Sequence, residues 1–187
     1  MARKVQRSDI LDWQTYTDQR DQRREAILPV KKARRVHLGS ELTFLFENTA
    51  TMLYQIQEMV RAERIVKEAS IQHEIDTYNS LLGDAGELSC SLLIEIEDVE
   101  ERRRKLTEWL ELPAHLYMKL EDGSRVCASY DVSQVGEDRL SAVQYLKFDT
   151  GGKPPVAVGC DMPGLVLEQE LSAAQKAALK DDLVSSA

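Results

Sequence analysis

The residue that most needs a chemical explanation is Glu63, which falls within an apolar face of a predicted helix. Asn48 or Thr49 caps this helix, and we expect it to extend to about Lys67. At about 100° per residue, Glu63 shares a face with Met52, Leu53, Ile56, Met59, Val60 and Val66. An ionised carboxylate is costly to bury there, so Glu63 must be paired, neutral or bound to a ligand.

Three interpretations of Glu63 stay open at this stage. In the first, its carboxylate forms a structural ion pair with an arginine of the basic N-terminal segment, or with Arg102, Arg103 or Arg104. In the second, it is a functional carboxylate in a ligand or metal pocket. In the third, this face of the helix is less buried than the apolar pattern predicts.

A ligand pocket would use polar side chains of this helix and of the segment before it. The ligand-binding candidates are His37, Glu47, Gln55, Glu58, Glu63 and Arg64. For a metal ion the candidates reduce to His37, Glu47 and Glu63, and His37 could meet Glu47 across a hairpin. This is the less favoured hypothesis, because the three histidines form no HxH or HExxH group. Glu58 and Arg61, three residues apart on the opposite face, predict an ordinary surface ion pair.

Recognisable catalytic sequences are absent from the chain. It contains no GxSxG, GxxxxGK[ST] or GxGxxG pattern, and Gly151-Gly152-Lys153 is followed by two prolines that offer no N–H to a phosphate. We therefore assign no catalytic residue and no cofactor from the sequence.

Composition predicts a globular protein that is neither exported nor embedded in a membrane. Of its 187 residues, 43% are hydrophobic and 30% charged. The apolar runs are too short to cross a bilayer, and the charged N-terminus is not typical of a secretion signal. The three cysteines, Cys90, Cys127 and Cys160, lie far apart in apolar stretches, so we expect buried thiols in a reducing compartment. The cytoplasm is the predicted location.

The net charge of −8 conceals an uneven distribution along the chain. Residues 1–35 carry ten Lys/Arg and five Asp/Glu, a local charge of +5, whereas residues 36–187 carry fourteen and twenty-seven, a local charge of −13. Because an acidic body repels phosphates, nucleic-acid binding is disfavoured, and RNA binding through residues 31–35 is a minor alternative. The basic segment could lie on its own acidic body or on a second copy, which would make a homo-oligomer.

The order of predicted elements indicates an α+β fold. We expect an antiparallel sheet of five to seven strands built from hairpins and covered by helices, with a basic helical arm at residues 1–35 and one domain at 36–187. Pro29 should break or kink the second helix of the arm. The predicted strands lie at about 35–38, 43–47, 91–97, 115–120, 125–130, 143–148 and 156–160.

Several runs resemble the bacterial family catalogued as domain of unknown function 3501. They are Arg34-Arg35-Val36-His37-Leu38-Gly39, Thr43-Phe44-Leu45-Phe46-Glu47-Asn48, Tyr54-Gln55-Ile56-Gln57-Glu58-Met59, Glu63-Arg64-Ile65, Glu100-Glu101-Arg102-Arg103-Arg104 and Ser141-Ala142-Val143. The resemblance implies a bacterial cytoplasmic protein encoded near iron–sulfur and rubrerythrin-type redox proteins. This chain has Gln144 and Met162 where the resemblance implies histidines, so a metal site built on those histidines would lack ligands here.

Taken with the absent catalytic motifs, the charge distribution favours a small accessory or interaction protein. The resemblance adds a redox or stress-response setting and a protein partner from it. The alternative is a small-ligand or metal-binding enzyme with a pocket around His37, Glu47 and Glu63.

Overall fold

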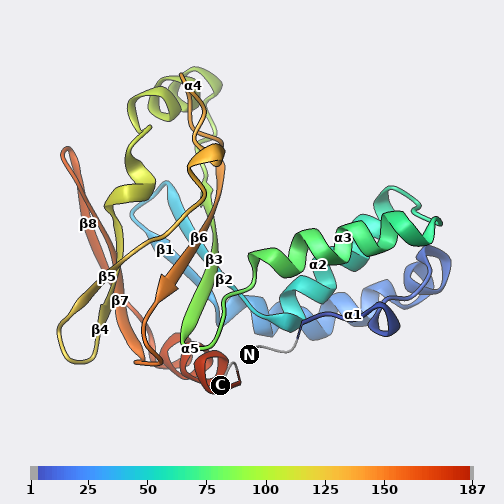
Figure 1. The fold of residues 1–187 in the computed structure, drawn as a ribbon. Coiled ribbons are helices and arrows are strands. Elements are labelled where there is room, and N and C mark those ends of the chain that lie inside the picture. Colours follow the sequence, from blue (N-terminus) through green and yellow to red (C-terminus); the bar gives the residue numbers. More distant parts are fainter. Residues whose placement is uncertain (1–3, 186–187) are drawn as a thin grey trace.

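Two antiparallel four-stranded sheets organise the chain, whose computed structural model describes residues 4–185 (Figure 1). The strand order is β1-β2-β3-β6 in the first sheet and β5-β4-β7-β8 in the second. The strands are β1 (Arg35–Leu38), β2 (Leu42–Glu47), β3 (Glu87–Ile94), β4 (Leu116–Leu120), β5 (Arg125–Cys127), β6 (Val143–Asp149), β7 (Pro155–Met162) and β8 (Leu165–Glu170). The helices are α1 (Trp13–Lys32), α2 (Thr49–Ala62), α3 (Glu68–Leu81), α4 (Val99–Glu108) and α5 (Ala173–Ser185).

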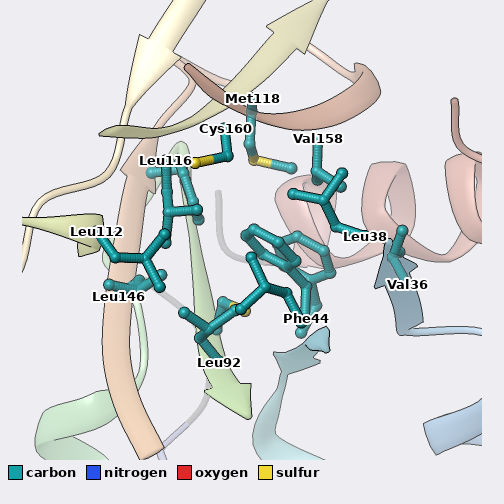
Figure 2. Packing of buried hydrophobic residues seen from close by; sticks show 14 of the residues in the cluster. Val36, Leu38, Phe44, Leu92, Leu112, Leu116, Met118, Leu146, Val158 and Cys160 are labelled. Carbon is teal, nitrogen blue, oxygen red and sulfur yellow. The ribbon is translucent and has the colours of Figure 1, made fainter. Parts of the chain in front are cut away.

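The two sheets form a β-sandwich because alternate side chains of each sheet are apolar and face the other sheet. In the first sheet, β1 and β2 pair so that Val36 lies opposite Phe44, and Phe44 lies opposite Leu92 of β3. These side chains meet Met118 and Val158 of the second sheet in one buried apolar cluster (Figure 2). Helix α4 lies at one end of the sandwich and α5 at the other (Figure 1), and both add leucines to the same cluster.

The second structural region is a helical arm, which we define as residues 4–32 together with α2 and α3. It projects from the side of the sandwich (Figure 1). Its buried apolar cluster is separate from that of the sandwich and consists of Val5, Ile10, Met52, Ile56, Val60, Ile71, Ile75 and Leu82. Residues 4–32 of the predicted basic arm therefore pack on α2 and α3, although the boundary at residues 35 and 36 itself stays a prediction.

The predicted α+β class, with antiparallel hairpins and an N-terminal helical arm, is confirmed. The expected single sheet of five to seven strands is instead two four-stranded sheets that cover each other's apolar faces. The eighth strand is β8, an edge strand at residues 165–170. The sequence did not predict β8. Its Val166 is 73% exposed, and its C-terminal half, residues 168–170, carries two glutamates, so the strand lacks a clear apolar alternation. Helix α1 continues through Pro29 to Lys32, contrary to the predicted break. Pro29 is exposed, so water can satisfy the carbonyl that loses its N–H partner.

None of the helices within residues 4–185 combines the length and the apolar character needed to span a bilayer.

Candidate functional site

Glu63 is not part of the buried apolar face, and the prediction that placed it there is wrong. Helix α2 ends at Ala62, Glu63 is the C-cap, and Arg64 adopts the left-handed conformation with φ of 51°. The N–H of Ile65 then donates to the carbonyl of Val60 at 2.9 Å, and that of Arg64 to Arg61 at 3.2 Å, as in a Schellman motif. This turn leaves the Glu63 side chain exposed.

The second part of the predicted stripe fails for the same reason. Val66, expected one turn beyond Glu63, is 73% exposed, because it follows the turn and is outside the helix. Among the described residues, Glu63 makes no ion pair with the basic segment or with Arg102, Arg103 or Arg104. The third interpretation, an exposed face, therefore holds.

Glu58 of α2 is one of the carboxylates that the basic segment binds. Arg20 donates to it through Nε and Nη2, both at 2.9 Å, and the Tyr16 hydroxyl donates at 2.8 Å. Arg61 lies 3.5 Å away, so the predicted surface pair is present as a minor contact. Burial raises the pKa of Glu58, but the hydrogen bonds from Arg20 and Tyr16 outweigh it and the net pKa is lowered.

Glu47 has the opposite electrostatic environment. It ends β2 and is surrounded by neutral donors: the Thr51 hydroxyl at 2.5 Å and the Ser91 hydroxyl at 2.9 Å. Burial raises its pKa more than these hydrogen bonds and the charge of Lys31 lower it. Glu47, rather than Glu63, is therefore a largely enclosed acid without an ion-pair partner among the described residues.

Gln55 and Arg64 make contacts within the arm. Gln55 of α2 lies near the Tyr78 hydroxyl of α3 and offsets part of the rise that burial causes in the pKa of Tyr78. The Arg64 guanidinium carbon lies 5.7 Å from the centre of the Trp13 ring, a cation–π distance. Both side chains therefore join helices of the arm to each other.

His37 is exposed on β1 and lies opposite Thr43, not opposite Glu47 as the hairpin hypothesis required. Its Nδ1 is 2.8 Å from the Thr43 hydroxyl, which donates to Glu95 at 2.5 Å. The three-residue turn at 39–41 sets this register, and it could not be read from the sequence.

The six predicted ligand-binding residues do not form one pocket. Glu47 and Glu63 lie at opposite ends of the 14-residue helix α2, which separates them by about 20 Å. Glu63 and Arg64 line a common pocket, whose lining includes none of the other four. Within residues 4–185, no group of three or more His, Cys, Asp or Glu side chains could hold a metal ion. The structure therefore does not bring His37, Glu47 and Glu63 together in one site.

The structure brings together a different set of residues, in a groove between α1 and α2. We call this the α1–α2 groove; it has a volume of about 320 Å³. It is lined by Tyr16, Arg23, Ala26, Ile27 and Val30 of α1 and by Ala50, Leu53, Tyr54 and Gln57 of α2. Apolar residues at helical spacing on both helices produce this surface.

Cations surround the α1–α2 groove. Arg23 lines it directly, and the Lys31 ammonium lies 5.1 Å from the centre of the Tyr54 ring. Neither residue, nor neighbouring Arg24, forms an ion pair with a described carboxylate. No Asp or Glu lines the groove. The sequence did not predict this groove, because the predicted break at Pro29 ended the apolar pattern of α1 before Val30.

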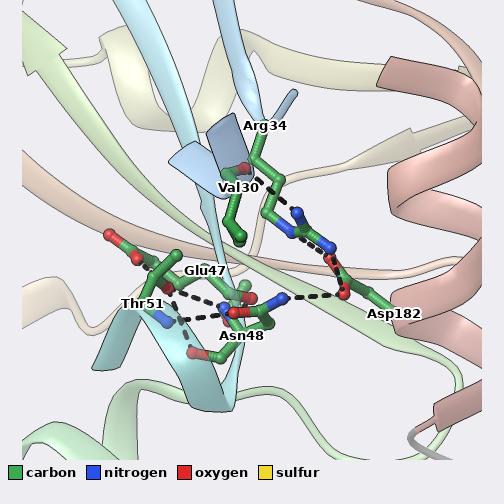
Figure 3. Close-up of polar contacts among 7 residues, drawn as sticks. Val30, Arg34, Glu47, Asn48, Thr51 and Asp182 are labelled. Atoms are coloured by element: carbon green, nitrogen blue, oxygen red, sulfur yellow. Dashed lines mark hydrogen bonds and ion pairs between the residues drawn. The ribbon is translucent and has the colours of Figure 1, made fainter. Parts of the chain in front are cut away.

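A buried ion pair fixes the arm to the sandwich. Arg34, 8% exposed, donates to both carboxylate oxygens of Asp182 on α5 at 2.7 and 2.8 Å, and to the carbonyl of Val30 at 3.0 Å (Figure 3). The Asn48 amide, which caps α2, also donates to Asp182 at 3.0 Å. The ends of α1 and α5 and the start of α2 therefore meet at one polar junction.

Residues 4–183 match the family described as protein of unknown function DUF3501. The chain belongs to this family. A crystal structure titled a novel protein of unknown function, from Burkholderia pseudomallei K96243, is similar to this family member. The two are 29% identical, with a TM-score of 0.87 over 97% of this chain and 100% of the other. No curated protein matches significantly.

In this DUF3501 family member, the two positions expected to hold histidines lie in the interior. Gln144 is fully buried and Met162 is 7% exposed. The Gln144 amide donates to the carbonyl of Ser141 at 2.9 Å. Both side chains therefore occupy packed positions, and neither offers the imidazole nitrogen that a metal site there would use.

The cysteines differ in their surroundings. Cys90 and Cys160 are buried as predicted, and burial raises the pKa of both thiols. Cys127 is exposed, contrary to the prediction, because it ends the short edge strand β5.

Proposed function

We propose that this protein is a non-catalytic accessory protein that binds an acidic, apolar segment of a protein partner in the α1–α2 groove. The observation that carries the proposal is an apolar groove whose only charged lining residue is Arg23, in a protein with net charge −8. Lys31 and Arg24 extend the positive charge along α1. An amphipathic helix with acidic flanks matches this surface in both shape and charge.

Glu58, a half-buried carboxylate bonded to Tyr16 of the groove, supports the same charge preference. Arg20 and Tyr16 satisfy its oxygens, so it does not pair with Arg23, whose guanidinium donates to the neutral Gln19 side chain. The rim of the groove therefore keeps its positive charge.

We further propose that the partner belongs to a redox or stress-response system in the bacterial cytoplasm, the setting that the family resemblance implies. Free thiols fit a reducing compartment. Because burial disfavours the thiolates of Cys90 and Cys160, we assign redox chemistry to the partner.

One observation favours a second candidate, a small-ligand enzyme that uses Glu47 as a general acid or base. A carboxyl with a raised pKa and neutral hydrogen-bond donors is typical of such a group. This candidate predicts that a thermal-shift screen finds a small molecule that stabilises the wild type but not Glu47→Gln. A screen in which every stabilising compound acts equally on both proteins would eliminate it.

Site-specific photo-crosslinking in the native host tests the accessory function. Leu53 in the groove is replaced by p-benzoylphenylalanine, and Val166, an exposed position on β8, serves as the matched control. We expect Leu53, but not Val166, to crosslink to one partner at a segment that alternates acidic and apolar residues. Crosslinks to a second copy of this chain, to a basic segment, or equally from both positions would contradict the proposal.

A further inference from the structure

A second pocket lies where α1 ends, beside β1 and the start of α5. We call it the β1–α5 pocket; it has a volume of about 520 Å³. Lys32, Arg35 and His37 line it, and no Asp or Glu does. Lys32 and Arg35 are exposed, and neither forms an ion pair with a described carboxylate. A pocket whose ionisable groups are all basic is unexpected in a protein with 32 acidic and 24 basic residues.

We propose that the β1–α5 pocket binds the phosphate group of a small phosphorylated molecule. Two fixed positive charges, from Lys32 and Arg35, match a phosphate dianion, and the arginine fork can bind two of its oxygens. The volume exceeds what a phosphate alone needs and lies within the range of small-molecule sites. The rest of the molecule would occupy the remaining space.

The hydrogen bonds of His37 determine which ring nitrogen can reach such a ligand. The Thr43 hydroxyl has one proton, which it donates to Glu95. Its oxygen can therefore only accept from His37, so Nδ1 carries a proton and Nε2 is the nitrogen available to the pocket. Nε2 donates to a phosphate oxygen only when the ring carries a proton on both nitrogens.

The start of α5 adds backbone donors to this basic cluster. Ser172 and Gln175 form a reciprocal cap: the Ser172 N–H donates to Gln175 Oε1 at 2.7 Å, and the Gln175 N–H donates to Ser172 Oγ at 3.3 Å. The N–H groups of Ala173 and Ala174 are the remaining donors of the first turn, and Ala174 lines the pocket. The Gln175 amide also donates to the carbonyl of Arg35 at 2.6 Å, which joins α5 to β1.

Imidazole NMR of the full-length wild type tests the proposal, with inorganic phosphate, glycerol 3-phosphate, sulfate and acetate as probes. We expect saturable shifts at His37 with phosphate, glycerol 3-phosphate and sulfate, and much weaker ones with acetate. His73 and His115 lie outside the pocket and are internal references. Tighter binding of glycerol 3-phosphate than of phosphate would support an organic ligand. Absence of saturation at His37, or acetate binding as tightly as phosphate, would overturn the proposal.

Matched variants separate this site from general charge effects. Arg35→Gln and Lys32→Gln should each weaken phosphate binding at least about tenfold, since each removes a charged hydrogen-bond donor. Lys180→Gln, an exposed lysine on α5 outside the pocket, should change it less than about twofold. Equal losses in all three variants, or none, would refute the site. The groove variants Arg23→Glu and Arg24→Glu should leave phosphate binding intact, so this proposal and the accessory function can fail separately.

Discussion

The β-sandwich and the helical arm differ in the contacts that stabilise them. In the sandwich, 24 of the described residues form one buried apolar cluster that joins both sheets, α4 and α5. In the arm, eight do so. Buried amides supplement them: Asn79 exchanges two hydrogen bonds with the backbone of Val5, and Gln57 exchanges two with Leu11, all at 2.9 Å.

This difference separates stability from recognition in the molecule. Apolar burial stabilises in proportion to area, so the sandwich should carry most of the free energy of unfolding. The arm depends on fewer and more directional contacts, so it should open locally at a lower cost. The α1–α2 groove lies in the arm, and the β1–α5 pocket lies where the arm meets the sandwich.

Truncating a core side chain should have the largest effect on stability in either region. In the sandwich it should lower global stability, whereas in the arm it should mainly increase local opening. Phe44→Ala removes a fully buried ring that packs near Phe46 and Phe148, with centroids 6.2 and 6.5 Å apart, and should cost about 3–5 kcal/mol of global stability. Ile56→Ala, in the smaller cluster, should cost about 2–4 kcal/mol and mainly increase local opening. Urea unfolding with hydrogen exchange measures both. Equal exposure of sandwich amides in the two variants would contradict the separation.

The next largest effect is expected at the junction between the regions. Arg34→Met leaves Asp182 without its bidentate partner in a site where the two side chains are 10% and 12% exposed, and should cost about 3 kcal/mol. The double variant Arg34→Met with Asp182→Leu removes both charges and should lose less than the single variant. Urea denaturation of both proteins checks this. A double variant less stable than Arg34→Met would show that the charge is not what destabilises the junction.

A smaller and local effect should follow from Asn79→Ala. It removes both hydrogen bonds to Val5 and should cost about 2 kcal/mol. The Val5 amide should lose protection from hydrogen exchange, while amides of β3 keep theirs. Gln72→Ala, which removes an exposed side chain of the same helix, is the control. If β3 exchanged as fast as Val5 in Asn79→Ala, the arm and sandwich would unfold as one unit.

The smallest stability effect concerns the pH dependence of Glu47. Its pKa in the folded protein lies above the ordinary value of 4.5, so the folded state holds the proton more tightly than the unfolded state. Stability should therefore fall as pH rises from about 4.5 through the raised pKa, and Glu47→Gln should abolish this fall. Glu63→Gln, an exposed carboxylate, is the control and should keep the wild-type profile within about 0.5 kcal/mol. A wild-type profile in Glu47→Gln would show that Glu47 does not cause the fall.

The sequence predicted the fold class because alternation and turn residues are local signals. Residues 36–46 contain two apolar stretches on either side of a glycine turn, and they form the antiparallel hairpin that was expected. Strand β8 escaped prediction, since an edge strand with one exposed face needs little apolar alternation. The end of α2 was placed too late because Arg64 takes the left-handed position that glycine usually marks.

The candidate site was less predictable, because its environment comes from residues distant in sequence. Glu47 is buried by its neighbours, including Ser91, which is 44 positions away. His37 faces Thr43 because of the length of the turn, and Glu58 is held by Arg20 from another helix. Sequence periodicity reports one face of one element, so it could not rank Glu47, Glu58 and Glu63 by burial or pairing.

In our proposal, the arm binds the protein partner, and this binding does not depend on the stability of the sandwich. The most direct test is the double variant Arg23→Glu with Arg24→Glu. Its control is the double variant Arg103→Glu with Lys180→Glu, which reverses the same number of charges at two exposed positions outside the groove. Partner retention and urea unfolding are measured on the same preparations. We expect the groove variant to lose the partner crosslinked from Leu53 while its unfolding free energy stays within about 0.5 kcal/mol of the control. Full retention of that partner by the groove variant, or equal loss in both, would contradict the claim.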